Sequence, residues 1–372
     1  MRIAVDAMGG DEAPAAVVAG AVAAARDFET GVLLCGDQRI IEGELGSHAT
    51  RGLSLEVCHA TEVIGMDEAP TVALRRPDAS LRRMVEAIAD GSAAAGVYAG
   101  NTGAGMVLGL HVLHRLPGVE RPAIAVPLPR EGGRTLLIDA GANVDTRALH
   151  LAQFGLMGDA YVRKERGIAA PRIALLANGT ETGKGDARVR EALSLLGHMP
   201  VNFVGLVEGS DLTRDVADVV VADGFVGNVA LKSLEGMGRR IGDELGSAFR
   251  AGWRGRLAYL LLRPAIRDLR ARIDSREVGG ALLLGLGGTL VKAHGSSDAH
   301  AIRNAIGQAR HLAELRMHQA VAHAMESVAL GSGAEASGTG AAAEAVPTRV
   351  RRYWRSLVER LRREGSEESS DE

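Results

Sequence analysis

Short apolar runs separated by polar, glycine-containing segments recur along most of the 372-residue chain. Before residue 230 these runs are rich in Val, Ile and Leu and are mostly continuous instead of alternating with polar residues. Continuous runs of this length are typical of strands in a parallel sheet that is covered on both faces. The expected strands are RIAVDA, GVLLCGD, LSLEVCHA, AAGVYAG, AIAVPL, TLLIDAG, RIALLANG, VNFVGLVE and ADVVVADG.

Alanine-rich stretches of helical character follow several of these runs, as in PAAVVAGAVAAARDF and NTGAGMVLGLHVLHR. This alternation predicts an α/β fold of three layers, with helices on both faces of a mainly parallel sheet and mainly right-handed crossovers. We expect a last strand pair in GGALLLGLGGTLVKAHG and then one long helix from about Asp298 to Leu330. Residues 1–330 form one domain in this interpretation.

A protruding helical hairpin is predicted at about 247–275, because the pattern after Asn228 changes to long helices. Pro264 lies within its second helical stretch, where a proline is expected to end or kink the helix. Seven arginines and one acidic residue flank an apolar tip between residues 250 and 272. This composition is typical of an interfacial membrane anchor, and dimer packing is the alternative. The membrane contacts at the tip would be Leu260, Leu261 and Leu262.

The end of the chain has a different composition. GSGAEASGTGAAAEAVPT (331–348) is typical of a flexible linker. Residues 349–372 follow, with RVRRYWRSLVERLRR and then the acidic end EGSEESSDE. The first of these segments predicts a basic amphipathic helix whose apolar face, including Trp354, contacts a membrane. So short a helix is marginal in solution, and a disordered tail is the alternative.

The composition excludes several classes of protein. Hydrophobic residues make up 46% and charged residues 24%, and the formal net charge of −3 indicates no particular partner. Aromatic residues are only 3%, which argues against nucleic-acid binding by base stacking. No run approaches the ~18 apolar residues of a membrane span, and the apolar stretch after Met1 is too short for a signal peptide. Cys35 and Cys58 lack a second ligand at metal spacing, so we expect free thiols in a reducing cytoplasm.

Glycine is the exception, with 48 residues, about twice the usual ~7%. Gly, Asn and Asp gather where the predicted strands end, and parallel sheets bind ligands at the carboxyl ends of their strands. A single loop of this kind could be a simple tight turn, but six of them predict a shared pocket. The loops are DAMGGDEAP, AGNTGAG, DAGANVD, ANGTETGKG, ADGFVGN and KAHGSSD.

Familiar catalytic and cofactor motifs do not fit these loops. The chain has no G-x-S-x-G, H-E-x-x-H or C-x-x-C, and GNTGAG has the wrong spacing for a dinucleotide site. ANGTETGKGD differs from a Walker loop, because three residues separate Gly179 from Gly183 and Lys184 is followed by Gly185. Backbone amides, asparagines, lysines and a histidine remain, which suits an anion bound without a metal or a cofactor.

Each loop also has a plain structural interpretation. Gly9 and Gly10 could direct N–H groups at an anion, or could simply form a strand-to-helix turn. Lys184 could meet phosphate as a mobile point charge, or could be a solvated surface lysine. His294, with Ser296 beside it, could move a proton near neutral pH or could be bonded to backbone.

Five segments together resemble one family. MRIAVDAMGGD, AGNTGA, DAGANVD, ADGFVGNVALK and VKAHGSSD are similar to motifs of the phosphate acyltransferases of bacterial phospholipid synthesis, the PlsX type. The resemblance runs in order from Met1 to about Leu330 and does not cover the tail. It implies a fold related to phosphotransacetylases and to isopropylmalate-type dehydrogenases, and a homodimer.

The resemblance also implies an activity and partners. A fatty acyl group would pass from acyl carrier protein to inorganic phosphate, and the acyl phosphate would then serve a membrane-bound glycerol-3-phosphate acyltransferase. Such an enzyme would be cytoplasmic and peripherally associated with the inner face of the membrane.

Roles for individual residues follow from the loops and the resemblance together. Phosphate is itself the nucleophile, so the protein has to orient a dianion and stabilise an oxyanion. Lys184 and Lys232 would supply positive charge, and His294 would move the proton. Asp6, Asp139 and Asp223 would order the loops, because their charge repels phosphate. Further phosphate contacts would come from Gly9, Gly10, Gly103 and Gly227 through the backbone, from the side chains of Asn101, Asn143 and Asn228, and from Thr102 and Ser296.

Two other functions are alternatives to this one. A dehydrogenase on the related fold would need a metal-binding aspartate set and a nucleotide site, and the sequence shows neither. A non-catalytic lipid-binding module would explain the amphipathic segments but not the six polar loops.

Overall fold

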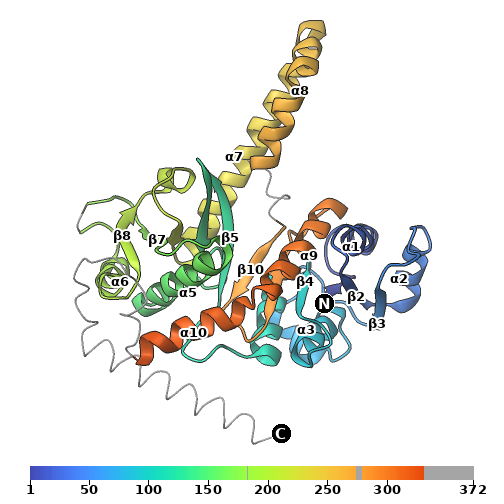
Figure 1. Cartoon of the computed structure of the whole chain (residues 1–372), viewed down its shortest axis with the longest axis horizontal. Helices are drawn as coiled ribbons and strands as arrows, with labels where there is room; N and C mark the ends of the chain where they lie inside the picture. The colour runs from blue at the N-terminus through green and yellow to red at the C-terminus, as the bar shows by residue number, and fades with distance from the viewer. Residues whose placement is uncertain (182, 274–278, 331–372) are drawn as a thin grey trace, which may run out of the picture.

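The computed structural model describes residues 1–181, 183–273 and 279–330 (Figure 1). The predicted linker at 331–348 and the segment 349–372 with Trp354 lie outside the described residues. No helix within the described ranges is both long enough and apolar enough to cross a bilayer.

In the part of the chain that the structure describes, the core is one eleven-stranded sheet. All the strands expected from the apolar runs are present, and the order across the sheet is β3-β2-β1-β4-β11-β10-β5-β6-β9-β7-β8. The strands are β1 Arg2–Asp6, β2 Gly31–Gly36, β3 Leu55–His59, β4 Ala95–Tyr98, β5 Ala123–Arg130, β6 Gly133–Ile138, β7 Arg172–Leu176, β8 Asn202–Val207, β9 Val219–Val221, β10 Ala281–Leu284 and β11 Thr289–Lys292.

Helices cover both faces of this sheet, which confirms the three-layer α/β/α prediction. Strand residues alternate between two buried clusters, so that Ile3 and Val5 belong to one and Ala4 to the other. The first cluster includes α1 Ala15–Asp27, α5 Ala148–Arg166, α6 Ala187–Gly197, α9 Ala299–Glu314 and α10 Met317–Leu330. The second includes α3 Ser80–Ala89, α4 Thr102–Leu108 and the beginning of α7 Gly224–Arg250, and α2 Gln38–Leu45 lies beside β3.

Strand direction divides the sheet into two halves. The pairs β11–β10, β10–β5 and β5–β6 are antiparallel, whereas all other neighbours are parallel. Three reversals in succession make β6 run opposite to β11. The carboxyl ends of β1, β4 and β11 therefore lie at one end of the sheet, here called the first end. Those of β6, β7 and β9 lie at the opposite, second end.

The long helix expected after Asp298 is two helices. α9 ends at Glu314, and Arg316 adopts a positive φ of 51° before α10 begins at Met317. The turn redirects the chain, because α9 packs on α1 whereas α10 packs on α5. Asp298 caps α9 through a 2.9 Å bond from the Ala301 N–H to its carboxylate.

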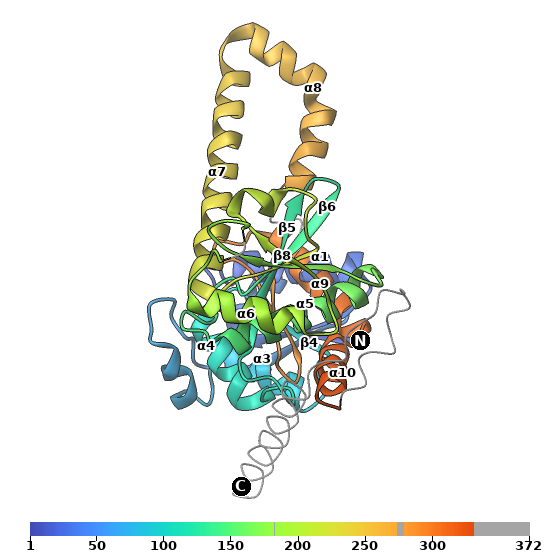
Figure 2. The same cartoon turned by 90° about the vertical axis from the view of Figure 1, so that its left-hand side faces the viewer.

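A helical hairpin projects from the body, as predicted, but it is longer than expected (Figures 1 and 2). Its first arm is α7, which begins inside the body at Gly224, and its second is α8 Gly252–Ile273. α8 continues through Pro264, so the helix does not end there. Pro264 is exposed, and water can bind the carbonyl that loses its helical N–H partner there.

Candidate active site

The loops after β1, β4 and β11 lie against one another at the first end of the sheet. The Asp11 N–H donates to the Gly295 carbonyl at 2.8 Å, which joins the β1 and β11 loops. Gly9 approaches Gly100 so closely that a Cβ atom on Gly9 would lie 3.0 Å from the Gly100 nitrogen. Gly10 has a positive φ of 113°. Glycine is required here because backbone packs on backbone.

Asp6 supports this arrangement from beneath. The residue is 3% exposed, and its carboxylate accepts hydrogen bonds from the backbone N–H groups of Met8, at 3.2 Å, and of Gly9. Burial raises the pKa of Asp6, and these hydrogen bonds act against that shift. The carboxylate thus orders the loop. The Gly9 N–H, which we expected to contact phosphate, is used by this carboxylate.

Lys232, His294 and Ser296 come together although they are distant in sequence. The Lys232 Nζ lies 3.4 Å from the His294 Nε2, and the His294 Nδ1 lies 2.9 Å from the Ser296 Oγ. Lys232 also donates to Glu235 at 2.9 Å. Burial, and then the charge of Lys232, lower the pKa of His294, so the imidazole is neutral near pH 7. α7 supplies the lysine, and the β11 loop supplies the histidine and serine.

Lys292 is a cation of this group that the loop motifs did not predict. Its Nζ donates to the carbonyls of Ala99, at 3.2 Å, and of Ala293. Burial, and then the nearby Lys232, lower the pKa of Lys292 to about 8. Lys292 is part of VKAHGSSD, but it is the last residue of a strand and not a loop residue.

Asn101 has a structural role instead of the predicted contact with phosphate. Its side-chain oxygen accepts from the Ala104 N–H and caps α4, and its amide donates to the carbonyls of Gly65, Met66 and Glu68 at 2.9–3.2 Å. Both amide hydrogens are therefore used.

The two residues after Asn101 differ in their surroundings. Thr102 is exposed at the beginning of α4. A Cβ atom on Gly103 would lie 2.4 Å from the Pro70 Cγ, which explains the glycine by close packing.

At the second end of the sheet, Asp139 organises the loop after β6. Its carboxylate accepts from the backbone N–H groups of Ile124, Gly141, Ala142 and Asn143 at 2.7–3.1 Å. The Asn143 amide donates to Asp139 and to the Pro122 carbonyl. Asn143 therefore has no amide hydrogen left for phosphate, and the predicted contact is corrected to a structural role.

The beginning of α7 packs on this loop. Asp223 caps the helix through the Val226 N–H at 2.9 Å. A Cβ atom on Gly227 would lie 1.9 Å from the Asp139 carbonyl oxygen, so only glycine fits. The Gly227 N–H bonds to the Asp223 carbonyl within the helix and is not a donor to substrate. Asn228 is exposed beside Gly141 and lies one turn before Lys232 on the same face of α7.

Lys184 also belongs to the second end. Its side chain is 47% exposed and its Nζ lies 3.8 Å from a carboxylate oxygen of Glu181 in the same loop. Arg188 connects this region to the beginning of α7 through a 2.9 Å bond to Asp223. Nine residues of helix from Asp223 to Lys232 span about 13 Å. The shared pocket expected from the six loops stays a prediction, since the reversed strand directions place the loops in two groups, which α7 connects.

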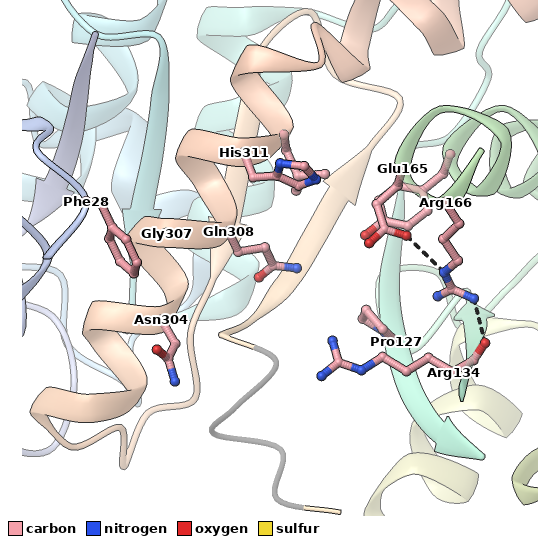
Figure 3. Close-up of a pocket in the computed structure, with 11 residues that line it drawn as sticks. Phe28, Pro127, Arg134, Glu165, Arg166, Asn304, Gly307, Gln308 and His311 are labelled. Carbon is pink, nitrogen blue, oxygen red and sulfur yellow. Dashed lines mark hydrogen bonds and ion pairs between the residues drawn. The ribbon is translucent and has the colours of Figure 1, made fainter. Parts of the chain in front are cut away.

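A cavity of about 260 Å³ lies elsewhere, between α9, α5 and the β5–β6 strands (Figure 3). Arg166 is bound there to Glu165 and to the Arg134 carbonyl. None of the predicted site residues lines this cavity. The part of the chain that the structure describes holds no cluster of three or more His, Cys, Asp or Glu side chains that could hold a metal ion.

Comparison with known proteins gives consistent matches over nearly the whole of this fold. A sequence profile of the family described as "Fatty acid synthesis protein" matches residues 1–320. The phosphate acyltransferase of Geobacter sp. (strain M21) is 45% identical over 307 residues, which cover 82% of this chain and 87% of the relative. That of Geobacter sulfurreducens is 43% identical over 328 residues, which cover 88% and 95%.

Among solved structures, the EutD phosphotransacetylase from Staphylococcus aureus superposes with a TM-score of 0.54. The match covers 86% of this chain and 94% of the other at 14% sequence identity. An identity this low shows a likeness of fold alone.

Proposed function

Because this chain belongs to the phosphate acyltransferase family and transfers an acyl group to phosphate, we propose that the acyl donor is a fatty acyl thioester of acyl carrier protein. The product is then an acyl phosphate for phospholipid synthesis. An oxygen of HPO₄²⁻ attacks the thioester carbonyl, the C–O bond forms and the C–S bond breaks. The phosphate proton ends on the leaving thiolate, so the products are the acyl phosphate dianion and the free thiol.

The group at the first end of the sheet suits this reaction. Lys232 and Lys292 supply positive charge for the incoming dianion, and Lys232 also supplies it for the oxyanion of the tetrahedral intermediate. Neutral His294 accepts the phosphate proton and returns it to the thiolate, while Ser296 orients the imidazole through the 2.9 Å contact to Nδ1. We assign Gly10, which packs against Gly295 of the β11 loop, to phosphate binding as well, together with Thr102 at the beginning of α4 and Asn228 one turn before Lys232.

One observation carries the proposal: α7 and the β11 loop bring Lys232 within 3.4 Å of His294. The direct test is phosphate-dependent release of carrier-protein thiol from an acylated carrier by the purified protein. We expect release to require phosphate and to yield acyl phosphate in equal amount. Release that is independent of phosphate would make the protein a thioesterase and would refute the proposal.

We also propose a cytoplasmic homodimer that associates peripherally with the inner face of the membrane and passes acyl phosphate to a membrane-bound glycerol-3-phosphate acyltransferase. The exposed apolar side chains of the hairpin support both contacts. Met237, Ile241 and Leu245 recur at four-residue spacing on α7 and suit a second copy of the chain. Leu260 and Leu261 on α8 are 65% and 74% exposed and suit a lipid surface.

A further inference from the structure

Lysine is rare in this chain and its positions are not scattered. Only four of the 43 Lys and Arg residues are lysines. Lys184, Lys232 and Lys292 belong to the two loop groups, and the fourth, Lys164, is exposed in the last turn of α5. Lysine differs from arginine in being a compact point charge on a flexible stem with three donors. Its distribution therefore points to positions where a compact cation is required.

Lys292 is held in place from the strand side. Its Nζ donates to the carbonyls of Ala99 and Ala293, which uses two of its three hydrogens. The ring of Tyr98 lies beneath, with its centroid 5.6 Å from Nζ. Within the described residues, the third hydrogen has no hydrogen-bond acceptor. A lysine fixed in this way presents one donor in a defined direction.

Lys232 places a second positive charge close to this one. The repulsion adds to burial in lowering the pKa of Lys292, while Asp11 and Asp6 act in the opposite direction. Asp6 is committed to the backbone of its own loop, and Glu235 is bound to Lys232. Two ammonium groups that repel each other are stabilised by an anion between them.

We propose that Lys292 is the fixed cation of the phosphate site, binding the attacking phosphate from the strand side while Lys232 binds it from α7. This inference rests on the proposed function, because it takes the anion bound here to be the acyl acceptor. Lys292 is then a substrate-binding residue for the acceptor and not for the acyl donor.

Activity measurements separate these roles. Lys292→Met should raise the KM for phosphate about 10- to 100-fold, because a hydrogen bond to a charged group is lost. The KM for the acylated carrier should change little, and Lys292→Arg should recover part of the phosphate affinity. Lys164→Met is the matched control, since it removes an exposed lysine remote from the loops. If the Lys292→Met protein folds and its phosphate KM is unchanged, Lys292 does not bind phosphate and only stabilises the loops.

A binding measurement on the unchanged enzyme covers the case in which Lys292→Met does not fold. With only four lysines, biosynthetic ¹³Cε-lysine labelling, which leaves the ammonium hydrogens in place, gives few side-chain signals, and Lys292→Arg assigns the signal of Lys292. We expect this signal to titrate near pH 8 and to shift to higher pH in phosphate, relative to chloride at equal ionic strength. An unshifted titration would overturn the inference.

The two proposals fail in different ways. If the wild-type protein releases no carrier thiol with phosphate, the proposed function fails. If it does so while the Lys292 titration and the phosphate KM of Lys292→Met stay as they were, only the role of Lys292 fails.

Discussion

Lys232 and Lys184 carry the same charge but lie at different ends of the sheet, and this difference can be measured. Lys232→Met should raise the phosphate KM at least about 10-fold, since hydrogen bonds to charged groups contribute ~1.5–3 kcal/mol. Lys184 belongs to the loop group at the second end of the sheet, and about 13 Å of α7, from Asp223 to Lys232, connects that group to Lys232. Lys184→Ala should therefore lower kcat/KM for the acylated carrier and leave the phosphate KM unchanged. A raised phosphate KM in Lys184→Ala would show that both ends of the sheet close on one phosphate.

His294 should set the acidic limit of activity. Its pKa is lowered by burial, with Lys232, Lys292 and Arg239 acting in the same direction and Glu235 against them. The imidazole is then neutral above its lowered pKa, so kcat/KM should fall only as the pH drops below 6.5. His294→Ala should remove this limb and lower kcat about 100-fold, within the usual range for general acid–base catalysis. A pH–rate profile with the same acidic limb in the variant would contradict the assignment.

Lys292 should set the alkaline limit for phosphate binding. Its pKa of about 8 means that the ammonium loses its proton as the pH rises through that value. The phosphate KM should therefore increase above pH 8, where Lys292 is neutral, and be lowest between about pH 7 and 8. Lys232 faces it from α7, Asp6 and Asp11 from the β1 side, Tyr98 from β4 and His294 from its own loop. Lys292→Arg should shift the rise to higher pH, since arginine stays charged.

At the residue scale, the sequence predicted that Lys232, His294 and Ser296 lie in one site, and the structure brings them together. The sequence also assigned four residues to phosphate whose N–H groups are bonded within the protein, namely Asn101, Asn143, Gly9 and Gly227. The difference has a physical cause. A lysine or histidine at a strand end finds few hydrogen-bond partners close by in the sequence. A side-chain amide or a backbone N–H, in contrast, readily forms a hydrogen bond with a neighbouring loop. Those partners, such as the carbonyls of residues 65–68, are distant in sequence and could not be deduced from a local motif.

At the element scale, the strands and most helices follow from apolar runs, but strand direction does not. A continuous apolar run is equally suited to either direction once helices cover both faces. The antiparallel β10, β5 and β6 therefore could not be deduced, and they decide which loops meet. The beginning of the hairpin was also misplaced, because the pattern after Asn228 contains no cap or break where α7 leaves the body.

The hairpin tip gives a test at the same scale. Leu260→Glu with Leu261→Glu should abolish sedimentation with anionic vesicles, because charge replaces the apolar surface that enters the lipid. Phosphate-dependent thiol release should persist, since both residues are remote from His294. A variant that instead dissociates or precipitates would assign these leucines to subunit packing.

For the whole molecule, the apolar stripe on α7 predicts the assembly. Met237→Glu with Ile241→Glu should convert a dimer into a monomer, because two charges would face the partner copy. Light scattering after size exclusion measures this directly, and Arg240→Ala on the neighbouring face is the control. If the double variant keeps the molar mass of the dimer in solution, the apolar stripe has no role in self-association.

The position of Lys232 on α7 has a mechanical consequence. The helix that carries this residue into contact with His294 continues without interruption to Arg250, about 27 Å farther on. A continuous helix of this length transmits a displacement of its far end to the segment that contacts His294. A force on the far end, from lipid or from another subunit, would therefore change the spacing of Lys232 and His294, and with it the rate of the reaction.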